Sequence, residues 1–216
     1  MPTLLEIQVS HRGPASVSRT LTDAFVEEWK KSHPDGQVIT RDLARNDISY
    51  VDSSWVQAAF VPAGQRTPGM EAALRESDEL LAELVAADHV VIGTPMYNFG
   101  VPAVLKAYID QIVRYYVAYG TASQVRSEYN GLLPDRTVSI IIASRDSYTP
   151  GSPLESSDFA GPYLKRIFEF MGITSVEVIP AGDSYSVRTG EITFEDHVAK
   201  FLPAVTAAAS ADTTAR

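Results

Sequence analysis

Residues 89–100 read HVVIGTPMYNFG. The first five residues, from His89 to Gly93, form an apolar run without alternating polar side chains, which is typical of a strand whose two faces are both covered by helices. A proline, two aromatic residues and a glycine then end the run between Pro95 and Gly100. We therefore predict a buried strand in a parallel sheet, followed by a loop at its carboxyl end.

Strand-like segments and helical segments alternate along the rest of the chain, which predicts an α/β protein with a doubly wound five-stranded parallel sheet and helices on both faces. Ligands bind such sheets beyond the carboxyl ends of the strands, so the loops after the first, third and fourth strands are the candidate site. We expect a single domain over residues 1–203 and a disordered tail over 204–216, where the side chains are small and polar. The other predicted strands are 4–10, 38–42, 137–143 and 174–180; the predicted helices are 18–31, 54–59, one from Thr67-Pro68, 101–116, one from Gly161-Pro162, and a last one with Phe194, Val198, Phe201 and Leu202.

Composition excludes several classes of function. The 216 residues contain 18 Lys and Arg against 27 Asp and Glu, a net charge of −9, and such a surface repels nucleic acid. The absence of cysteine excludes disulfides, thiolate metal sites and cysteine nucleophiles. The four histidines show no metal-ligand spacing, so no metal is expected. Without a targeting segment or an apolar run of ~20 residues, we expect a cytoplasmic protein with no membrane partner.

The first strand-end loop, residues 10–18, places serines and a glycine before a helix N-terminus. It lacks the glycine spacing of a dinucleotide fold and the lysine of a P-loop. Serine hydroxyls and free backbone N–H groups there can still cradle a phosphate, because each hydrogen bond to a charged group contributes roughly 1.5–3 kcal/mol and the helix dipole about 1 kcal/mol. Arg12 can add charge. The alternative is that Ser16 or Ser18 only caps the helix.

The second strand-end loop carries Met96, Tyr97 and Phe99, which a turn does not require. Two aromatics and a methionine at the end of a strand suit a flat, apolar ligand, and Asn98 offers a donor and an acceptor to the edge of a heterocycle. The alternative is a proline-shaped connection whose Tyr97 and Phe99 enter the core.

These loops also carry a family resemblance. The stretch from 77 to 114, centred on Pro95-Met96-Tyr97-Asn98-Phe99, resembles the FMN-dependent NADH-azoreductases, which are close to the NAD(P)H:quinone reductases of flavodoxin-like fold. The likeness covers roughly residues 4–180. Shorter matching stretches are Ser16-Val17-Ser18, Arg41-Asp42-Leu43, Ser144-Arg145 and Phe170-Met171-Gly172-Ile173.

The resemblance implies strand order 2-1-3-4-5, a noncovalently held FMN, and a homodimer with two active sites at its interface. It implies that the chemistry takes place at flavin N5 with no catalytic side chain, and that NADH or NADPH is the co-substrate. Carried over position by position, the cofactor-binding residues are Ser10, Arg12, Ser16, Val17 and Ser18 toward the phosphate, Pro95, Met96, Tyr97, Asn98 and Phe99 along the isoalloxazine ring, and Ser144, Arg145, Asp146 and Ser147 on the other side of the flavin.

Two places depart from the family pattern. Asp146 and Ser147 stand where the family has two glycines, and a carboxylate near the pyrimidine edge would disfavour an anionic reduced flavin. The family also has an aromatic residue that covers the substrate in the loop at 118–130. Tyr119 and Tyr129 are the substrate-binding candidates here, together with Trp55, which we expect to reach the partner subunit's site.

We therefore expect an oxidoreductase that passes two electrons from NADH or NADPH to a quinone or an aromatic azo compound. The nucleotide leaves before the acceptor enters, in a ping-pong cycle, because both are flat and one aromatic slot serves both. A flavodoxin-type electron carrier that docks to a redox protein is the alternative, although such carriers lack the excursions at 44–66 and 118–134. A third class, a flavin-free module of the same fold, predicts no chromophore.

Overall fold

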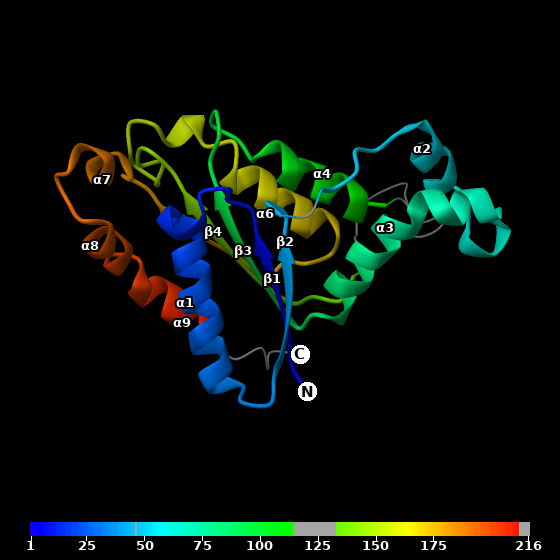
Figure 1. Ribbon diagram of the computed structural model, residues 1–216, viewed down its shortest axis with the longest axis horizontal. Helices are drawn as coiled ribbons and strands as arrows, with labels where there is room; N and C mark the ends of the chain where they lie inside the picture. The colour runs from blue at the N-terminus through cyan, green and yellow to red at the C-terminus, as the bar shows by residue number, and fades with distance from the viewer. Residues whose placement is uncertain (46, 115–132, 212–216) are drawn as a thin grey trace.

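Five parallel strands form the centre of the computed structural model, which describes residues 1–45, 47–114 and 133–211 (Figure 1). Their order, β2-β1-β3-β4-β5, confirms the predicted topology. The strands are β1 Thr3–Gln8, β2 Gln37–Asp42, β3 His89–Pro95, β4 Thr137–Ala143 and β5 Val176–Ala181. The α-helices are α1 Val17–Ser32, α2 Ser53–Ala59, α3 Pro68–Ala86, α4 Ala103–Ile112, α6 Gly161–Phe170, α7 Tyr185–Thr189, α8 Phe194–Ala199 and α9 Leu202–Ser210, and short 3-10 helices cover Gly13–Ala15, Ala63–Gln65 and Glu155–Ser157.

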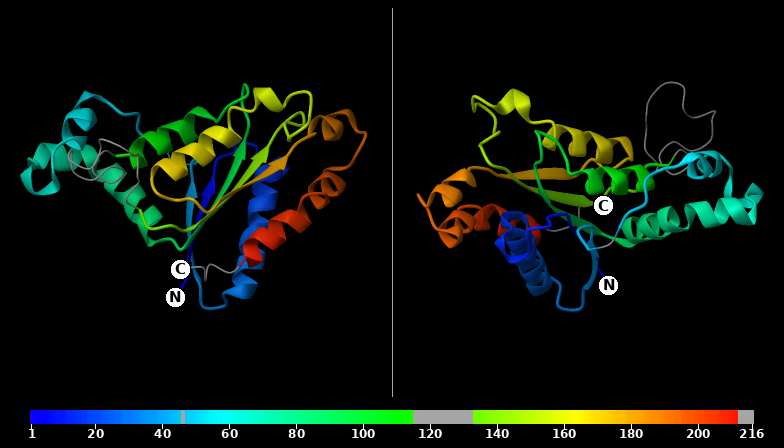
Figure 2. Two further views of the ribbon diagram at one scale, coloured as in Figure 1. Left: turned by 180° about the vertical axis from the view of Figure 1, so that it is seen from behind. Right: turned by 45° about the horizontal axis from the view of Figure 1, so that its top comes forward.

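Successive residues of each strand point to opposite faces of the sheet, and each face has its own helical layer (Figure 2). Leu4 and Val91 pack into the layer that contains α1, α8 and α9. Leu5 and Ile92, one position further along, pack into the layer of α3, α4 and α6. Burial on both faces explains why the central strands are continuous apolar runs in the sequence.

The C-terminal region corrects the sequence prediction. The last helix is two helices, α8 and α9, and α9 includes residues 204–210, so the prediction of a disordered tail is wrong for that stretch. Pro203 occupies the first turn, where a missing N–H costs nothing, and alanine is the strongest helix former. Val205, Ala208 and Ala209 are small enough to be buried in the layer of α1. Residues 212–216 lie outside the described residues.

His89, the first residue of β3, is buried between the sheet and α1. Its Nε2 atom lies 3.2 Å from the Ser139 hydroxyl, and its ring meets the Phe25 ring edge-on. Burial disfavours the charged ring and lowers the pKa of His89 to about 4. Burial also lowers the pKa of His197 on α8. Both groups are therefore stabilised in their neutral form by folding.

We expect the free energy of unfolding to fall as the pH is lowered from about 6.5 to about 4. In that window the unfolded chain binds a proton at His89 and the folded chain does not, so the full stability is present above pH 6.5 and up to about 3 kcal/mol is lost on acidification. Urea denaturation across this range checks the slope. His89→Gln, which is neutral at every pH, should flatten it and leave the contributions of His197 and of carboxyl groups with a lowered pKa, such as Asp135; equal slopes in the two proteins would contradict the assignment.

Candidate functional site

A cleft of about 180 Å³ opens where the loops after β1, β3 and β4 meet at one edge of the sheet. The strand order reverses between β1 and β3, which is where ligands of doubly wound sheets bind. We call it the serine cleft. It is lined by Ser10, Arg12, Ser16, Val17, Ser18, Pro95, Met96, Tyr97, Ala143, Ser144, Arg145 and Ser184.

The serine cleft brings together most of the residues predicted to bind the cofactor, from all three loops. Among the predicted residues, Asn98, Phe99, Asp146 and Ser147 are not part of its lining. Ala143 and Ser184 do line it and were not predicted. The juxtaposition of the three loops follows from the parallel sheet, since the carboxyl ends of parallel strands share one edge.

Three serines with buried side chains form the wall next to α1: Ser10, Ser16 and Ser18 are at most 3% exposed. Ser16 caps α1, because its hydroxyl accepts a hydrogen bond from the Arg19 N–H at 3.3 Å, so the capping alternative holds for this residue. The Ser18 hydroxyl lies 3.2 Å from that of Ser16, which is its one partner within the described part of the chain. Hydroxyls and free N–H groups at a helix N-terminus are the donors that a phosphate requires, so the cleft fits the expected group here.

Arg19 fixes the shape of this first loop. Its Nε atom donates to the Ser10 carbonyl at 2.7 Å, and its Nη2 atom donates to Asp42 at 2.6 Å. Burial alone would raise the pKa of Asp42, but hydrogen bonds from Arg19 and from the Ala44 N–H hold it below its usual value. The ion pair thus ties the loop after β1 to the end of β2. The role of Arg19 could not be predicted from the sequence, because nothing in the local pattern indicates a contact with a residue 23 positions away.

The loop after β3 is a tight turn. The Tyr97 N–H donates to the Gly100 carbonyl at 2.9 Å and the Gly100 N–H donates back at 3.0 Å. Asn98 and Phe99 have φ angles of 50° and 69°, the pattern of a type I′ turn. Left-handed backbone is uncommon in residues other than glycine, costs of order 1–3 kcal/mol, and concentrates at functional sites. The turn leaves Tyr97 and Phe99 44% and 48% exposed, so the alternative that they enter the core is wrong.

The loop after β4 is held by the segment after β5. The Ser184 N–H donates to the Ser144 carbonyl at 3.2 Å, which brings Ser184 to the serine cleft. A Cβ atom on Gly182 would lie 2.9 Å from the Asp146 carbonyl and 3.1 Å from the Ser147 Cα atom. The close backbone approach at this loop is therefore made by Gly182 on the facing segment. The Asp146 carboxylate, half-exposed, lies 3.8 Å from Arg145 Nε.

Of the three predicted substrate-binding residues, the structure describes Trp55. Trp55 on α2 is 9% exposed and packs with Leu74 of α3, and its Nε1 atom donates to Gln111 at 2.8 Å. The structure thus places Trp55 in the core between α2 and α3 and not in the serine cleft. Tyr119 and Tyr129 lie outside the described residues.

The charges of the serine cleft are positive. Arg12 and Arg145 line it, and none of its described lining residues is a carboxylic acid or a histidine. An anionic group is therefore favoured, and among these residues no carboxyl or imidazole is available as a general acid.

Among the described helices, none has the length and apolar character needed to cross a membrane.

Comparison with known proteins agrees with this geometry. A family model described as flavodoxin-like fold matches residues 2–203. A Burkholderia lata protein named FMN-dependent NADH:quinone oxidoreductase 8 is 45% identical over 201 residues, which is 93% of each chain. A Jannaschia protein named FMN-dependent NADH:quinone oxidoreductase 2 is 42% identical over 97% of this chain and 100% of its own. The crystal structure of azoreductase AzrA superposes with a TM-score of 0.82 at 26% identity, covering 96% of this chain and 99% of that one.

Proposed function

This chain belongs to the flavodoxin-like family of the FMN-dependent NADH:quinone oxidoreductases, and on that premise we propose that it binds FMN noncovalently and passes two electrons from a reduced pyridine nucleotide to a quinone or an aromatic azo compound. One observation carries the proposal. Three buried serines of the loop between β1 and α1 and of the first turn of α1, the strained Tyr97–Gly100 turn and the Ser144 loop meet in one positively charged cleft at the switch point of the sheet.

The residues of the serine cleft have separable roles in this proposal. Ser16 and Ser18 donate hydrogen bonds to the phosphate of FMN, and Arg12 compensates its charge. Met96 and Tyr97 provide an apolar wall for the isoalloxazine ring. The Arg19–Asp42 pair positions the Ser10 backbone. When bound, FMN supplies the two-electron hydride chemistry, and the protein positions it.

The exposed aromatic side chains Tyr97 and Phe99 support the use of one slot by both reactants. The reduced nucleotide and the acceptor are flat, so each can stack against the same wall in turn. The described lining residues include neither a carboxylic acid nor a histidine, and in this proposal water supplies the proton to the acceptor. The shared slot supports a ping-pong order, and the proposal includes no catalytic side chain.

A homodimer in the cytoplasm is part of the proposal. Phe159, which is 64% exposed, has its N–H bonded to the Phe99 carbonyl at 3.0 Å, so exposed aromatics cluster beside the site. Exposed apolar patches of this kind mark interfaces. Sedimentation equilibrium of the purified protein tests the dimer, and a monomer at working concentration would remove this part of the proposal.

An absorbance spectrum of the purified protein tests the central claim. We expect a flavin band near ~450 nm that stoichiometric NADH bleaches under anaerobic conditions and that a quinone restores. A flavin that neither NADH nor NADPH reduces would indicate the electron carrier instead. A protein that stays colourless after FMN is added would refute the proposal.

A further inference from the structure

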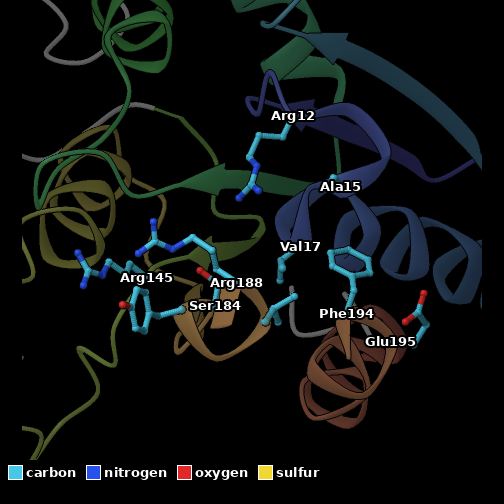
Figure 3. Close-up of a pocket in the computed structure, with 10 residues that line it drawn as sticks. Arg12, Ala15, Val17, Arg145, Ser184, Arg188, Phe194 and Glu195 are labelled. Carbon is cyan, nitrogen blue, oxygen red and sulfur yellow. The ribbon is translucent and has the colours of Figure 1, made fainter. Parts of the chain in front are cut away.

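A second and larger pocket, of about 620 Å³, adjoins the serine cleft. It lies between the N-terminal end of α1 and the α7–α8 segment, and it shares four lining residues with the cleft, so the two are continuous (Figure 3). We call it the arginine pocket. It is lined by Arg12, Ala15, Val17, Arg145, Ser184, Tyr185, Val187, Arg188, Phe194 and Glu195.

Three arginines gather in this pocket, in a chain whose net charge is −9. The guanidinium carbons of Arg145 and Arg188 lie 4.5 and 4.6 Å from the centre of the Tyr185 ring, so one ring orients both. Among the described residues, Arg12 and Arg188 have no carboxylate at ion-pair distance, and the one partner of Arg145 is Asp146 at 3.8 Å. No ion pair closer than 3.8 Å neutralises these three guanidinium groups among the described residues, and all three arginines line the pocket.

The two ends of the arginine pocket differ in chemistry. Arg12 and Arg145 line both pockets, so the cationic end is the end that joins the serine cleft. Phe194 and Glu195 lie on the opposite side of the pocket from Arg145, with Arg188 and Val17 between them (Figure 3). A ligand that extends from the cleft thus meets cations first, and then an aromatic ring beside a carboxylate.

We propose that the arginine pocket binds the adenosine diphosphate half of NADH, an inference that rests on the proposed function. Arg145 and Arg188 contact the pyrophosphate, because one guanidinium group can donate two parallel hydrogen bonds to the oxygens of a phosphate. Phe194 and Val17 provide the apolar surface for adenine. Glu195 accepts from the ribose hydroxyls and repels the additional 2′-phosphate of NADPH, so the pocket selects NADH.

Binding of ADP-ribose, which has the adenosine diphosphate half and cannot donate a hydride, tests the proposal on the FMN-loaded protein. By calorimetry we expect Arg188→Ala to weaken ADP-ribose binding about tenfold and Arg188→Lys to recover part of it. Arg75→Ala, at an exposed site on α3, is the matched control and should bind as the wild type does. Equal affinity for ADP-ribose in the wild type and Arg188→Ala would overturn the assignment.

Steady-state kinetics provide the second arm. Arg188→Ala should raise the KM for NADH about tenfold and change the rate with a benzyl dihydronicotinamide, which has no phosphate, much less. Glu195→Gln should raise the ratio of kcat/KM for NADPH to that for NADH about tenfold. Equal losses with both hydride donors, or loss of FMN from Arg188→Ala, would place the arginines in the flavin site and overturn this proposal. Failure of the wild type to accept hydride from either donor would instead refute the proposed function.

Discussion

Ser16→Asp is expected to lower the affinity for FMN by about 1,000-fold or more while the fold stays intact. In the proposed site the substitution removes a hydrogen bond to the charged phosphate, worth roughly 1.5–3 kcal/mol, and places a negative charge beside that phosphate. Two charges 4 Å apart near a protein surface repel by about 4 kcal/mol, and each 1.4 kcal/mol is a factor of ten. Aspartate is as good an N-cap as serine, so α1 keeps its first turn.

Two variants separate binding from helix capping. Ser16→Ala loses the hydrogen bond and the cap but adds no charge, so we expect about 10- to 100-fold weaker FMN binding and about 1 kcal/mol less stability. Thr67→Asp makes the same kind of change at the N-cap of α3, where the Thr67 hydroxyl accepts from the Met70 N–H away from the cleft, and it should bind FMN normally. Fluorescence titration of the apoprotein with FMN measures the affinity, and thermal unfolding measures the stability. Normal FMN affinity in Ser16→Asp would show that the phosphate is not held at this helix.

The core and the location of the site could be predicted because both depend on local pattern. The apolar run at 89–93 indicates a strand buried on both faces, and alternation of such runs with helices requires a parallel sheet. Once the sheet is parallel, the loops that contain Ser16, Tyr97 and Ser144 must share an edge. No contact between distant residues had to be known for these steps.

The parts that were missed depend on tertiary contacts. Ser184 reaches the cleft only because its N–H pairs with the Ser144 carbonyl, and the 182–184 segment has no pattern that predicts this. Asn98 is a residue type that tolerates a left-handed φ angle, but the left-handed φ angle of Phe99 is imposed by the closure of the turn. The segment at 204–210 looked like a polar tail because its alanines have little hydrophobic signal, yet small side chains are what allows α9 to approach α1.

Gly93→Ala is expected to destabilise the protein by about 3 kcal/mol and to weaken FMN binding at the same time. Gly93 is the point where β3 passes under α1, and a Cβ atom there would lie 2.1 Å from the Thr22 hydroxyl oxygen and 3.0 Å from the Ser18 carbonyl. Overpacking of a tight core costs typically 1–3 kcal/mol, and here the backbone of α1 must move as well. Because Ser18 belongs to the turn at residues 16–18 that we propose binds the phosphate, this movement displaces its hydroxyl from the cleft.

The mechanism predicts a specific rescue. Thr22→Ala removes the oxygen that makes the shortest contact, so the double variant Gly93→Ala/Thr22→Ala should be more stable than Gly93→Ala alone. Thr22→Ala by itself should be less stable than the wild type, because it removes the hydrogen bond from the Thr22 hydroxyl to the Ser18 carbonyl at 2.8 Å. In the double variant the Cβ atom added at position 93 still lies close to the Ser18 carbonyl oxygen, so the stability should be restored only in part and the affinity for FMN should stay below that of the wild type. Gly64→Ala, where an added Cβ has no atom within 4 Å, controls for the loss of a glycine and should change stability by less than about 0.5 kcal/mol. Urea denaturation of the four members of the cycle measures the coupling; strictly additive losses would mean that α1 yields elsewhere and that Gly93 does not set the position of the turn at residues 16–18.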